Sequence, residues 1–145
     1  MTGNLFITFE GGDGSGKSTQ INKVKEFLEA RGMSVLLTRE PGGTAIGEKI
    51  RELILDRNNS EMYAMTEAML YAASRTQHVQ QVIKPALAEG ITVICDRFVD
   101  SSIAYQGYGR NLGEAVKIIN SYAVEDCIPD ITFLLKLDPE VGKGR

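Results

Sequence analysis

Apolar residues in this chain form short runs that alternate with segments where they recur every three or four positions. The runs are rich in β-branched and aromatic residues, which is typical of strands. One of them, Ile91 to Cys95, is almost wholly apolar and predicts a strand buried on both faces. The predicted strands are residues 4–10, 34–38, 91–95 and 131–137.

The periodic segments predict helices. Thr44 is a plausible N-cap for the second of them, and Gly32 and Gly90 are expected to end the first and the third. Pro85 is expected to interrupt the third segment, since proline removes a helical hydrogen bond. The predicted helices are residues 17–30, 44–54, 61–87 and 112–124.

Strands that alternate with helices predict an α/β fold with a parallel sheet covered by helices on both faces. Ligands of such folds bind at the carboxyl ends of the strands. No repeat or linker divides the chain, so residues 1–145 are expected to form a single domain. The stretch after the last strand reads as the start of a further element, so we expect the domain to be incomplete at its C-terminus.

Residues 11–18 match the phosphate-loop pattern G-x-x-x-x-G-K-[ST], and they stand between a predicted strand and a predicted helix. Glycines leave backbone N–H groups open to a phosphate, and the helix N-terminus adds its own attraction. We expect Lys17 to reach the phosphates of ATP and the Ser18 hydroxyl to bind Mg²⁺. The alternative is a glycine-rich turn with a surface lysine. The expected ATP-binding residues are Gly11, Gly12, Asp13, Gly14, Ser15, Gly16, Lys17, Ser18 and Thr19.

Composition narrows the function classes. The chain has 145 residues and a formal net charge of -3, and its basic residues are spread out, so no nucleic-acid partner is indicated. No apolar run has membrane-spanning length and no signal peptide is visible, which favours a cytoplasmic protein. Cys95 and Cys127 lie far apart in sequence and lack C-x-x-C or histidine-rich company, so no zinc or redox site is expected and each is expected to be a free buried thiol.

Polar residues follow the predicted strands. Asp96, directly after the third strand, suits an acidic residue that holds Mg²⁺, and the alternative is a turn or capping residue. Arg97 could clamp an acceptor phosphate or, alternatively, pair with Asp100 on the surface. The other strand-end positions are Asp13, Arg39, Glu40 and Asp138.

Two further segments could recognise a nucleoside. Tyr71 and Arg75 are spaced i, i+4 on one helix face, although spacing alone favours a core-boundary tyrosine and an exposed arginine. His78 has no partner cluster in the sequence and is expected to be structural or exposed. The loop that contains Ser101, Ser102, Tyr105 and Gln106 suits nucleoside recognition, though many solvated loops look similar.

Together these motifs resemble the bacterial thymidylate kinase family. The resemblance rests on FEGGDGSGKS (9–18), TREPGGT (38–44), EAMLYAASRTQH (67–78) and DRFVDSSIAYQGYG (96–109). It implies a P-loop NTPase fold of the nucleoside monophosphate kinase type, a three-layer α/β/α arrangement with four of five strands present. It also implies Mg²⁺-dependent transfer of the ATP γ-phosphoryl group to dTMP, giving dTDP and ADP for dTTP biosynthesis, by a homodimer.

The resemblance also implies residue roles. Asp13 holds the sugar 3′-hydroxyl, Arg39 and Arg97 bind the acceptor phosphate, and Arg51 lies close by. Tyr71 stacks on thymine and Arg75 donates to it. Ser102 and Gln106 contact the base or its surroundings, and Tyr105 packs under the sugar. On this resemblance the catalytic residues are Lys17, Asp13, Arg97 and Arg39, the acceptor ligands are Asp13, Arg39, Arg51, Tyr71, Arg75, Arg97, Ser102, Tyr105 and Gln106, and the metal ligands are Ser18 and Asp96.

The chain departs from the family pattern at two places. Tyr71 stands where the family often has phenylalanine, which adds a hydroxyl that needs a partner or water. Family members with glycine at the position of Gly14 take a catalytic arginine from a lid after the fourth strand, and this chain ends at Arg145. Two hypotheses follow: an active kinase, or a module that binds nucleotides and transfers phosphate slowly. A GTPase is a weaker third, because no N-K-x-D motif is present.

Overall fold

The computed structural model of the chain describes residues 4–12, 15–99 and 112–135. Strands and helices alternate as the apolar pattern predicts, with boundaries that differ by a few residues from the predicted ones. The elements are β1 (Phe6–Gly11), α1 (Lys17–Glu29), β2 (Val35–Arg39), α2 (Ala45–Leu55), α3 (Ala64–His78), the π-helix η1 (Val79–Ile83), α4 (Lys84–Ala88), β3 (Thr92–Asp96), α6 (Glu114–Val124) and β4 (Ile131–Leu135).

The four strands form one parallel sheet in the order β2-β3-β1-β4. In this sheet Phe9 of β1 lies opposite Asp96 of β3, and Arg39 of β2 lies opposite Asp96 from the other side. The carboxyl ends of three strands therefore meet at one edge, where the sequence places its polar residues. The predicted α/β fold is confirmed.

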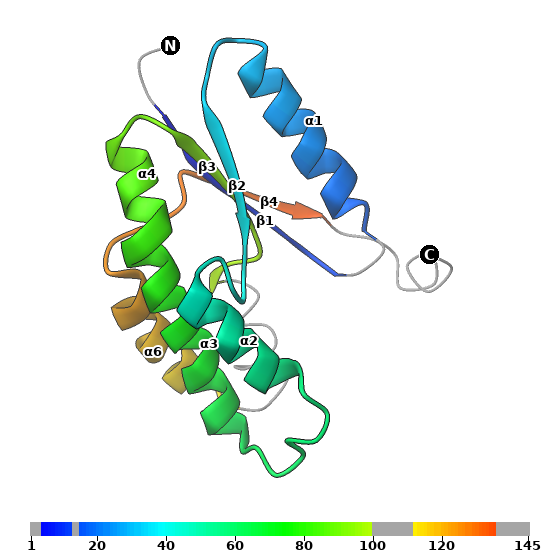
Figure 1. Cartoon of the computed structure of the whole chain (residues 1–145), viewed down its shortest axis with the longest axis vertical. Helices are drawn as coiled ribbons and strands as arrows, with labels where there is room; N and C mark the ends of the chain where they lie inside the picture. The colour runs from blue at the N-terminus through cyan, green and yellow to red at the C-terminus, as the bar shows by residue number, and fades with distance from the viewer. Residues whose placement is uncertain (1–3, 13–14, 100–111, 136–145) are drawn as a thin grey trace.

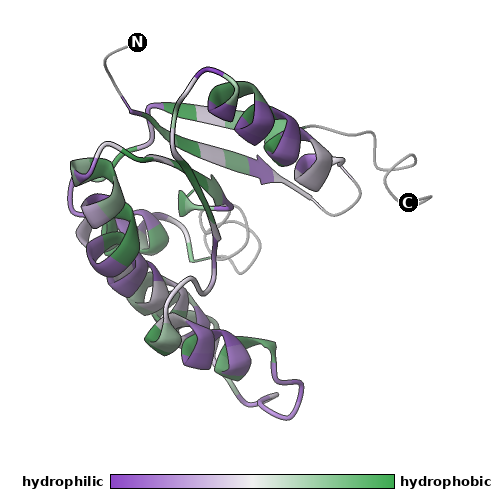
Figure 2. Cartoon of the chain, turned by 45° about the horizontal axis from the view of Figure 1, so that its top comes forward, coloured by the Kyte–Doolittle hydropathy of each residue, from purple (hydrophilic) through white to green (hydrophobic). Residues whose placement is uncertain are grey.

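Side chains on β1 and β3 alternate between two buried clusters. One cluster packs against α1, which lies on one face of the sheet (Figure 1); its members are Ile7, Phe9, Ile21, Leu28 and Ile94. The other packs against the helices of the opposite face; its members are Phe6, Val79, Ile83, Ala86, Val93, Cys95, Phe98, Val124 and Cys127. The predicted three layers follow from this alternation, and Figure 2 shows that α1 turns its hydrophilic side outward.

The third predicted helix begins at Ala64, later than the expected position 61, and Pro85 does not interrupt it. Instead, the π-helical turn η1 joins α3 to α4, with helical backbone angles on either side of the turn. A proline ring clashes with the carbonyl four residues earlier, here that of Gln81, which lies within η1. A wider π-helical turn gives that ring room, so the helix continues to Ala88.

Strand β4 is the exception to the prediction that helices cover both faces. Ile131, Phe133 and Leu134 are 39, 40 and 59% exposed. Phe133 does stack on Phe9, with 4.9 Å between the ring centroids. Among the described elements, full coverage is confined to the central strands β1 and β3. None of the described helices is both long and apolar enough to cross a membrane.

Candidate active site

The phosphate loop leads from β1 into the first turn of α1. Gly16 is the N-cap of this helix, with a φ of 82°, in the left-handed region that glycine favours. Gly16 has no side chain that could cap the first N–H groups of α1, so these donors are open to a ligand. A Cβ atom at Gly12 would meet nothing within 4 Å, so this side of the loop is also open. This geometry suits a phosphate.

Lys17 and Asp96 are brought together by the pairing of β1 with β3. The ammonium group of Lys17 lies 2.8 Å from Oδ1 of Asp96 and donates to the carbonyl of Gly11 at 3.3 Å. Only 10% of the Lys17 side chain is exposed, so the pair is partly desolvated. The lysine that should reach the phosphates and the acid that should hold the metal are therefore neighbours.

A cleft of about 520 Å³ opens beside this pair. Ser18, Arg39 and Asp96 line it together, from α1 and from the ends of β2 and β3. The remaining lining residues are Ile21, Asn22, Leu37, Thr38 and Gly43. Hydroxyl and carboxylate oxygens face the same space as a guanidinium group, which is the combination needed for a divalent cation next to a phosphate.

Arg39 and Arg51 lie beside the loop that follows β2. Nη2 of Arg39 contacts the Glu48 carboxylate at 3.1 and 3.4 Å, and Nη1 of Arg51 donates to the Pro41 carbonyl at 3.0 Å. The hydrogen bond from Arg39 lowers the pKa of Glu48 below its usual 4.5, with smaller effects of the charges of Arg39 and Arg51 in the same direction. The pair is largely exposed, so its net strength is small and an anionic ligand could compete for Arg39.

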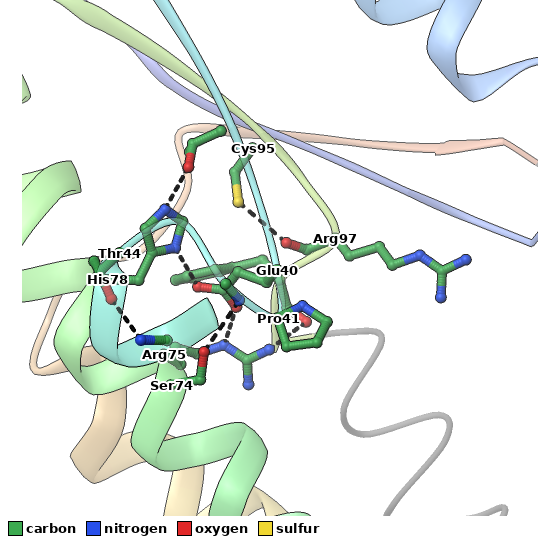
Figure 3. Close-up of polar contacts among 12 residues, drawn as sticks. Glu40, Pro41, Thr44, Ser74, Arg75, His78, Cys95 and Arg97 are labelled. Atoms are coloured by element: carbon green, nitrogen blue, oxygen red, sulfur yellow. Dashed lines mark hydrogen bonds and ion pairs between the residues drawn. The ribbon is translucent and has the colours of Figure 1, made fainter. Parts of the chain in front are cut away.

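Arg97 adopts an unusual backbone conformation directly after β3. Its φ of 72° lies in the left-handed region, which costs a residue with a Cβ atom on the order of 1 kcal/mol or more. Figure 3 shows its side chain pointing away from the buried groups around Glu40 and Arg75. The neighbouring positive charge of Arg97 also acts on the phenol of Tyr71.

Tyr71 is half-buried on α3, as the core-boundary alternative expected. Burial raises the pKa of its phenol above 10.0, and the charge of Glu67 adds to this. The charges of Arg97, Arg51 and Arg75 act in the opposite direction and reduce the rise in the pKa. Tyr71 thus stays protonated near neutral pH, and three arginines lie close enough for their charges to act on its phenol.

Arg75 is not the exposed arginine that its spacing favours. It is 2% exposed, and its Nε donates to Oε1 of Glu40 at 2.5 Å. Its other nitrogens donate to Oδ1 of Asn120 and, at 3.0 Å, to the carbonyl of Phe98. The guanidinium therefore joins the end of β2, the segment after β3 and α6.

His78 is fully buried, so the exposed alternative is wrong and the structural one is confirmed. Its Nδ1 lies 2.7 Å from Oε2 of Glu40 and its Nε2 lies 2.6 Å from Oγ1 of Thr38. The expectation that His78 has no partner cluster is also wrong. Glu40, one of the marked strand-end residues, holds both Arg75 and His78, and only the fold brings these groups together.

Both cysteines are free and buried, as predicted. The fold places residues of metal-ligand type beside Cys95, since its Sγ and ligand atoms of Glu40 and His78 lie within 4.8 Å of one another. However, burial first and the charge of Glu40 second raise the pKa of Cys95 well above 9.0, and metals bind the thiolate. Arg75 already neutralises the same carboxylate. The cluster is best described as a hydrogen-bonded part of the core.

Several predicted positions lie outside the described residues. They include the expected sugar and base ligands, the possible partner of Arg97, the last strand-end acid and one glycine of the phosphate loop. These are Asp13, Gly14, Asp100, Ser101, Ser102, Tyr105, Gln106 and Asp138.

Sequence reasoning overlooked one buried carboxylate and its partner. Glu10, 3% exposed at the end of β1, accepts a hydrogen bond from the backbone N–H of Phe98 at 3.0 Å. The sequence did offer a signal: Glu10 directly follows the strand residues Leu5 to Phe9, at a position where an apolar residue would be usual. Asn120 was missed in the same way, since it lies on the buried face of α6.

Comparisons with known proteins give one consistent result. A family model described as thymidylate kinase matches residues 9–145. The thymidylate kinase of Bacillus velezensis is 54% identical over 142 residues, which cover 97% of this chain and 67% of that protein. The thymidylate kinase of Halothermothrix orenii is 56% identical over 142 residues, which cover 97% of this chain and 68% of that protein. The crystal structure of thymidylate kinase from Ehrlichia chaffeensis matches with a TM-score of 0.86 at 42% identity, covering 98% of this chain and 81% of that one.

Proposed function

Because this chain belongs to the thymidylate kinase family, we propose residue roles for its reaction, the phosphorylation of dTMP by ATP in nucleotide biosynthesis. The observation that supports them best is the shared cleft of Ser18, Arg39 and Asp96, next to the contact between Lys17 and Asp96. A phosphoryl transfer needs donor phosphate, metal and acceptor phosphate within a few ångströms of one another. This edge of the sheet offers groups suited to all three.

The donor end is the phosphate loop with the first turn of α1. Backbone N–H groups around Gly12 and Gly16 bind the ATP phosphates, and Lys17 neutralises charge on the phosphoryl group in transfer. For this, Lys17 exchanges its contact with Asp96 for one with phosphate. Lys17 suits such an exchange, because its ammonium group stands on a flexible stem with three rotatable donors.

Mg²⁺ is proposed as the metal. The oxygens of Ser18 and Asp96 fit its preference for hard ligands, and both residues line one cleft. Oδ1 of Asp96 accepts no hydrogen bond from the described residues beyond its ion contact with Lys17, so it has capacity for a cation or its water. When bound, the metal neutralises charge on the phosphates.

The acceptor phosphate is assigned to Arg39 and Arg97, with Arg51 nearby. Arg39 lines the cleft and lies opposite Asp96 in the sheet, and Arg97 directly follows Asp96 at the end of β3. The phosphate oxygen of dTMP attacks the γ-phosphorus of ATP, and the bond from that phosphorus to the bridging oxygen of ADP breaks. The attacking phosphate is already anionic near neutral pH, so alignment and charge neutralisation carry the reaction without a strong general base.

The nucleoside is assigned to α3. Tyr71 offers a ring for stacking on thymine and stays protonated at neutral pH. The role of Arg75 as a donor to the base is proposed from the family resemblance. The roles of Asp13, Ser102, Tyr105 and Gln106 towards the sugar and base remain proposals from the family resemblance. The same holds for the single kinase domain across residues 1–145.

The proposal includes a homodimer. Met69 on α3 and Ile118 and Tyr122 on α6 are 55, 58 and 80% exposed, and the two helices pack against each other. Exposed apolar side chains on two packed helices suit contact with a second copy of the chain better than contact with water. A cytoplasmic location is proposed as well, where ATP and nucleotides are available.

The deciding experiment measures ADP release with dTMP, dUMP, dCMP or AMP as acceptor. Strong preference for dTMP is expected, and comparable rates with AMP would contradict the proposed acceptor site. Separate calorimetric titrations of dTMP and ATP show whether binding survives if turnover is slow. Tight binding of both with little ADP release would support the binding-module hypothesis for this chain.

A further inference from the structure

The strained backbone at Arg97 is held by hydrogen bonds on every side. The Arg97 N–H donates to the Phe9 carbonyl at 2.8 Å, and the Cys95 thiol donates to the Arg97 carbonyl at 3.1 Å. The next peptide groups are held by charged side chains: the Phe98 N–H donates to Glu10 at 3.0 Å, and the Phe98 carbonyl accepts from Arg75 at 3.0 Å. We call residues 97 and 98 with these bonds the Arg97 clamp.

The clamp fixes the point from which the Arg97 side chain leaves the backbone. A residue in the left-handed region relaxes unless its surroundings hold it there, and such strain is concentrated at functional positions. Phe98 anchors the other side, because its ring is 1% exposed and packs edge-on against Phe6 with centroids 5.1 Å apart. With both peptide groups fixed, the side chain of Arg97 leaves the backbone in a set direction, away from the buried groups around Glu40 and Arg75 (Figure 3).

Glu10 is the unusual member of the clamp. A buried carboxylate costs several kcal/mol of desolvation, whereas a backbone N–H could be satisfied by a neutral acceptor. The charged acceptor makes a hydrogen bond roughly twice as strong as a neutral one. Glu10 also lies at the end of β1, immediately before the phosphate loop. It therefore ties the donor-binding loop to the segment that carries Arg97.

We propose that Glu10 is a positioning residue for Arg97, which holds the peptide after Arg97 so that its guanidinium meets the acceptor phosphate. Glu10 itself touches neither nucleotide. The proposal rests on the assignment of Arg97 to the acceptor phosphate. If the role of Glu10 were purely structural, its loss would weaken the fold without a specific effect on how strongly the phosphate of dTMP is bound.

The test compares the affinities of dTMP and thymidine, measured by calorimetry, because their ratio reports the contribution of the phosphate and needs no turnover. Arg97→Ala is expected to reduce this ratio about 10-fold to 100-fold. Glu10→Met, which keeps the length and removes the acceptor, is expected to reduce it about 10-fold while thymidine affinity stays nearly constant. In the double variant the Glu10 change should have little further effect, because its action passes through Arg97.

Thr8→Val is the matched control. Thr8 is buried on the same face of β1 as Glu10, and its hydroxyl bonds that of Thr132 at 2.8 Å, which is not one of the hydrogen bonds of the Arg97 clamp. This variant should lose stability and keep the affinity ratio. Glu10→Gln keeps an acceptor of lower strength and should give a ratio between those of the wild type and Glu10→Met.

The outcomes separate the two proposals. If Arg97→Ala leaves the ratio unchanged, the assignment of Arg97 to the phosphate is wrong. If Arg97→Ala lowers the ratio but a folded Glu10→Met keeps it, or lowers dTMP and thymidine affinity equally, the positioning role is wrong. Should Glu10→Met fail to fold by circular dichroism, an unchanged ratio in Glu10→Gln overturns the proposal in its place.

Discussion

The ammonium group of Lys17 lies 2.8 Å from Oδ1 of Asp96, across the boundary between the phosphate loop and the end of β3. The register of the two central strands sets this contact, since Phe9 and Asp96 lie opposite each other. Asp96 is thereby available both to the lysine and to a cation in the adjoining cleft. This double role leads to the first prediction.

Asp96→Asn should raise the Mg²⁺ concentration needed for half-maximal ADP release, on the order of tenfold or more, because an amide offers a weaker ligand than a carboxylate. A Mg²⁺ titration at saturating ATP and dTMP measures this shift. Asp56→Asn is the control, since Asp56 is exposed at the end of α2, away from the cleft. An unchanged Mg²⁺ requirement in Asp96→Asn would remove this residue from the metal site.

Arg97→Ala should lower turnover by about two orders of magnitude or more while the fold stays intact, because a lost charge clamp costs several kcal/mol in the transition state. Steady-state ADP release and circular dichroism give the two readouts. Arg57, exposed in the turn after α2, provides the control Arg57→Ala. Equal rates for the two variants would mean that another residue binds the acceptor phosphate.

Gly43→Ala should destabilise the protein by about 2 kcal/mol or more. Gly43 has a φ of +86°, and an added Cβ would lie 2.5 Å from the ring of His78, which cannot move because it is fully buried. Urea unfolding measures the loss. Gly32→Ala is a close control, since its φ is +82° but an added Cβ there meets nothing within 4 Å, so only the backbone strain of about 1 kcal/mol is expected. Equal losses in both variants would argue against a steric role of His78.

Stability should decline as the pH rises above about 9, through the thiol of Cys95. Burial raises its pKa in the folded state well above 9.0, so its contribution is fully present below the unfolded-state pKa and is lost as the pH rises through the folded value. The unfolding free energy, measured by urea titration between pH 7 and pH 10, should fall less steeply in Cys95→Ala. Cys127→Ala controls for the second thiol, whose pKa is also raised. The same slope in Cys95→Ala and wild type would assign the decline to other groups.

Met69→Asp together with Tyr122→Asp should convert a homodimer into monomers, because two charges would be buried in the proposed interface. Light scattering after size-exclusion chromatography reads the mass directly. Lys49→Asp, at an exposed position on α2, is a control for the effect of surface charge. A wild-type chain that is monomeric at high concentration would contradict the proposed dimer.

The sequence alone determined the order of the elements and one end of the site. Runs of β-branched residues and helical periodicity need only near neighbours in the chain, so the alternation of strands and helices was readable. The phosphate loop was readable for the same reason, because its glycines, Lys17 and Ser18 lie within one continuous stretch. Thr44 was likewise correct as an N-cap, and its hydroxyl accepts from the Gly47 N–H at 2.8 Å.

Only the tertiary structure decided which distant charges meet. Glu40, Arg75 and His78 come from two elements, and local spacing made Arg75 look exposed, since an isolated helix face gives no sign of what packs upon it. The continuation of the helix through Pro85 likewise depended on the wider π-helical turn before it, and the periodicity of apolar residues gives no sign of such a turn. Glu10 and Phe98 are 88 positions apart in sequence, yet adjacent parallel strands bring them to one hydrogen bond. Pairing in a parallel sheet is non-local, so the direction of the Arg97 side chain is determined by the fold and not by the sequence pattern.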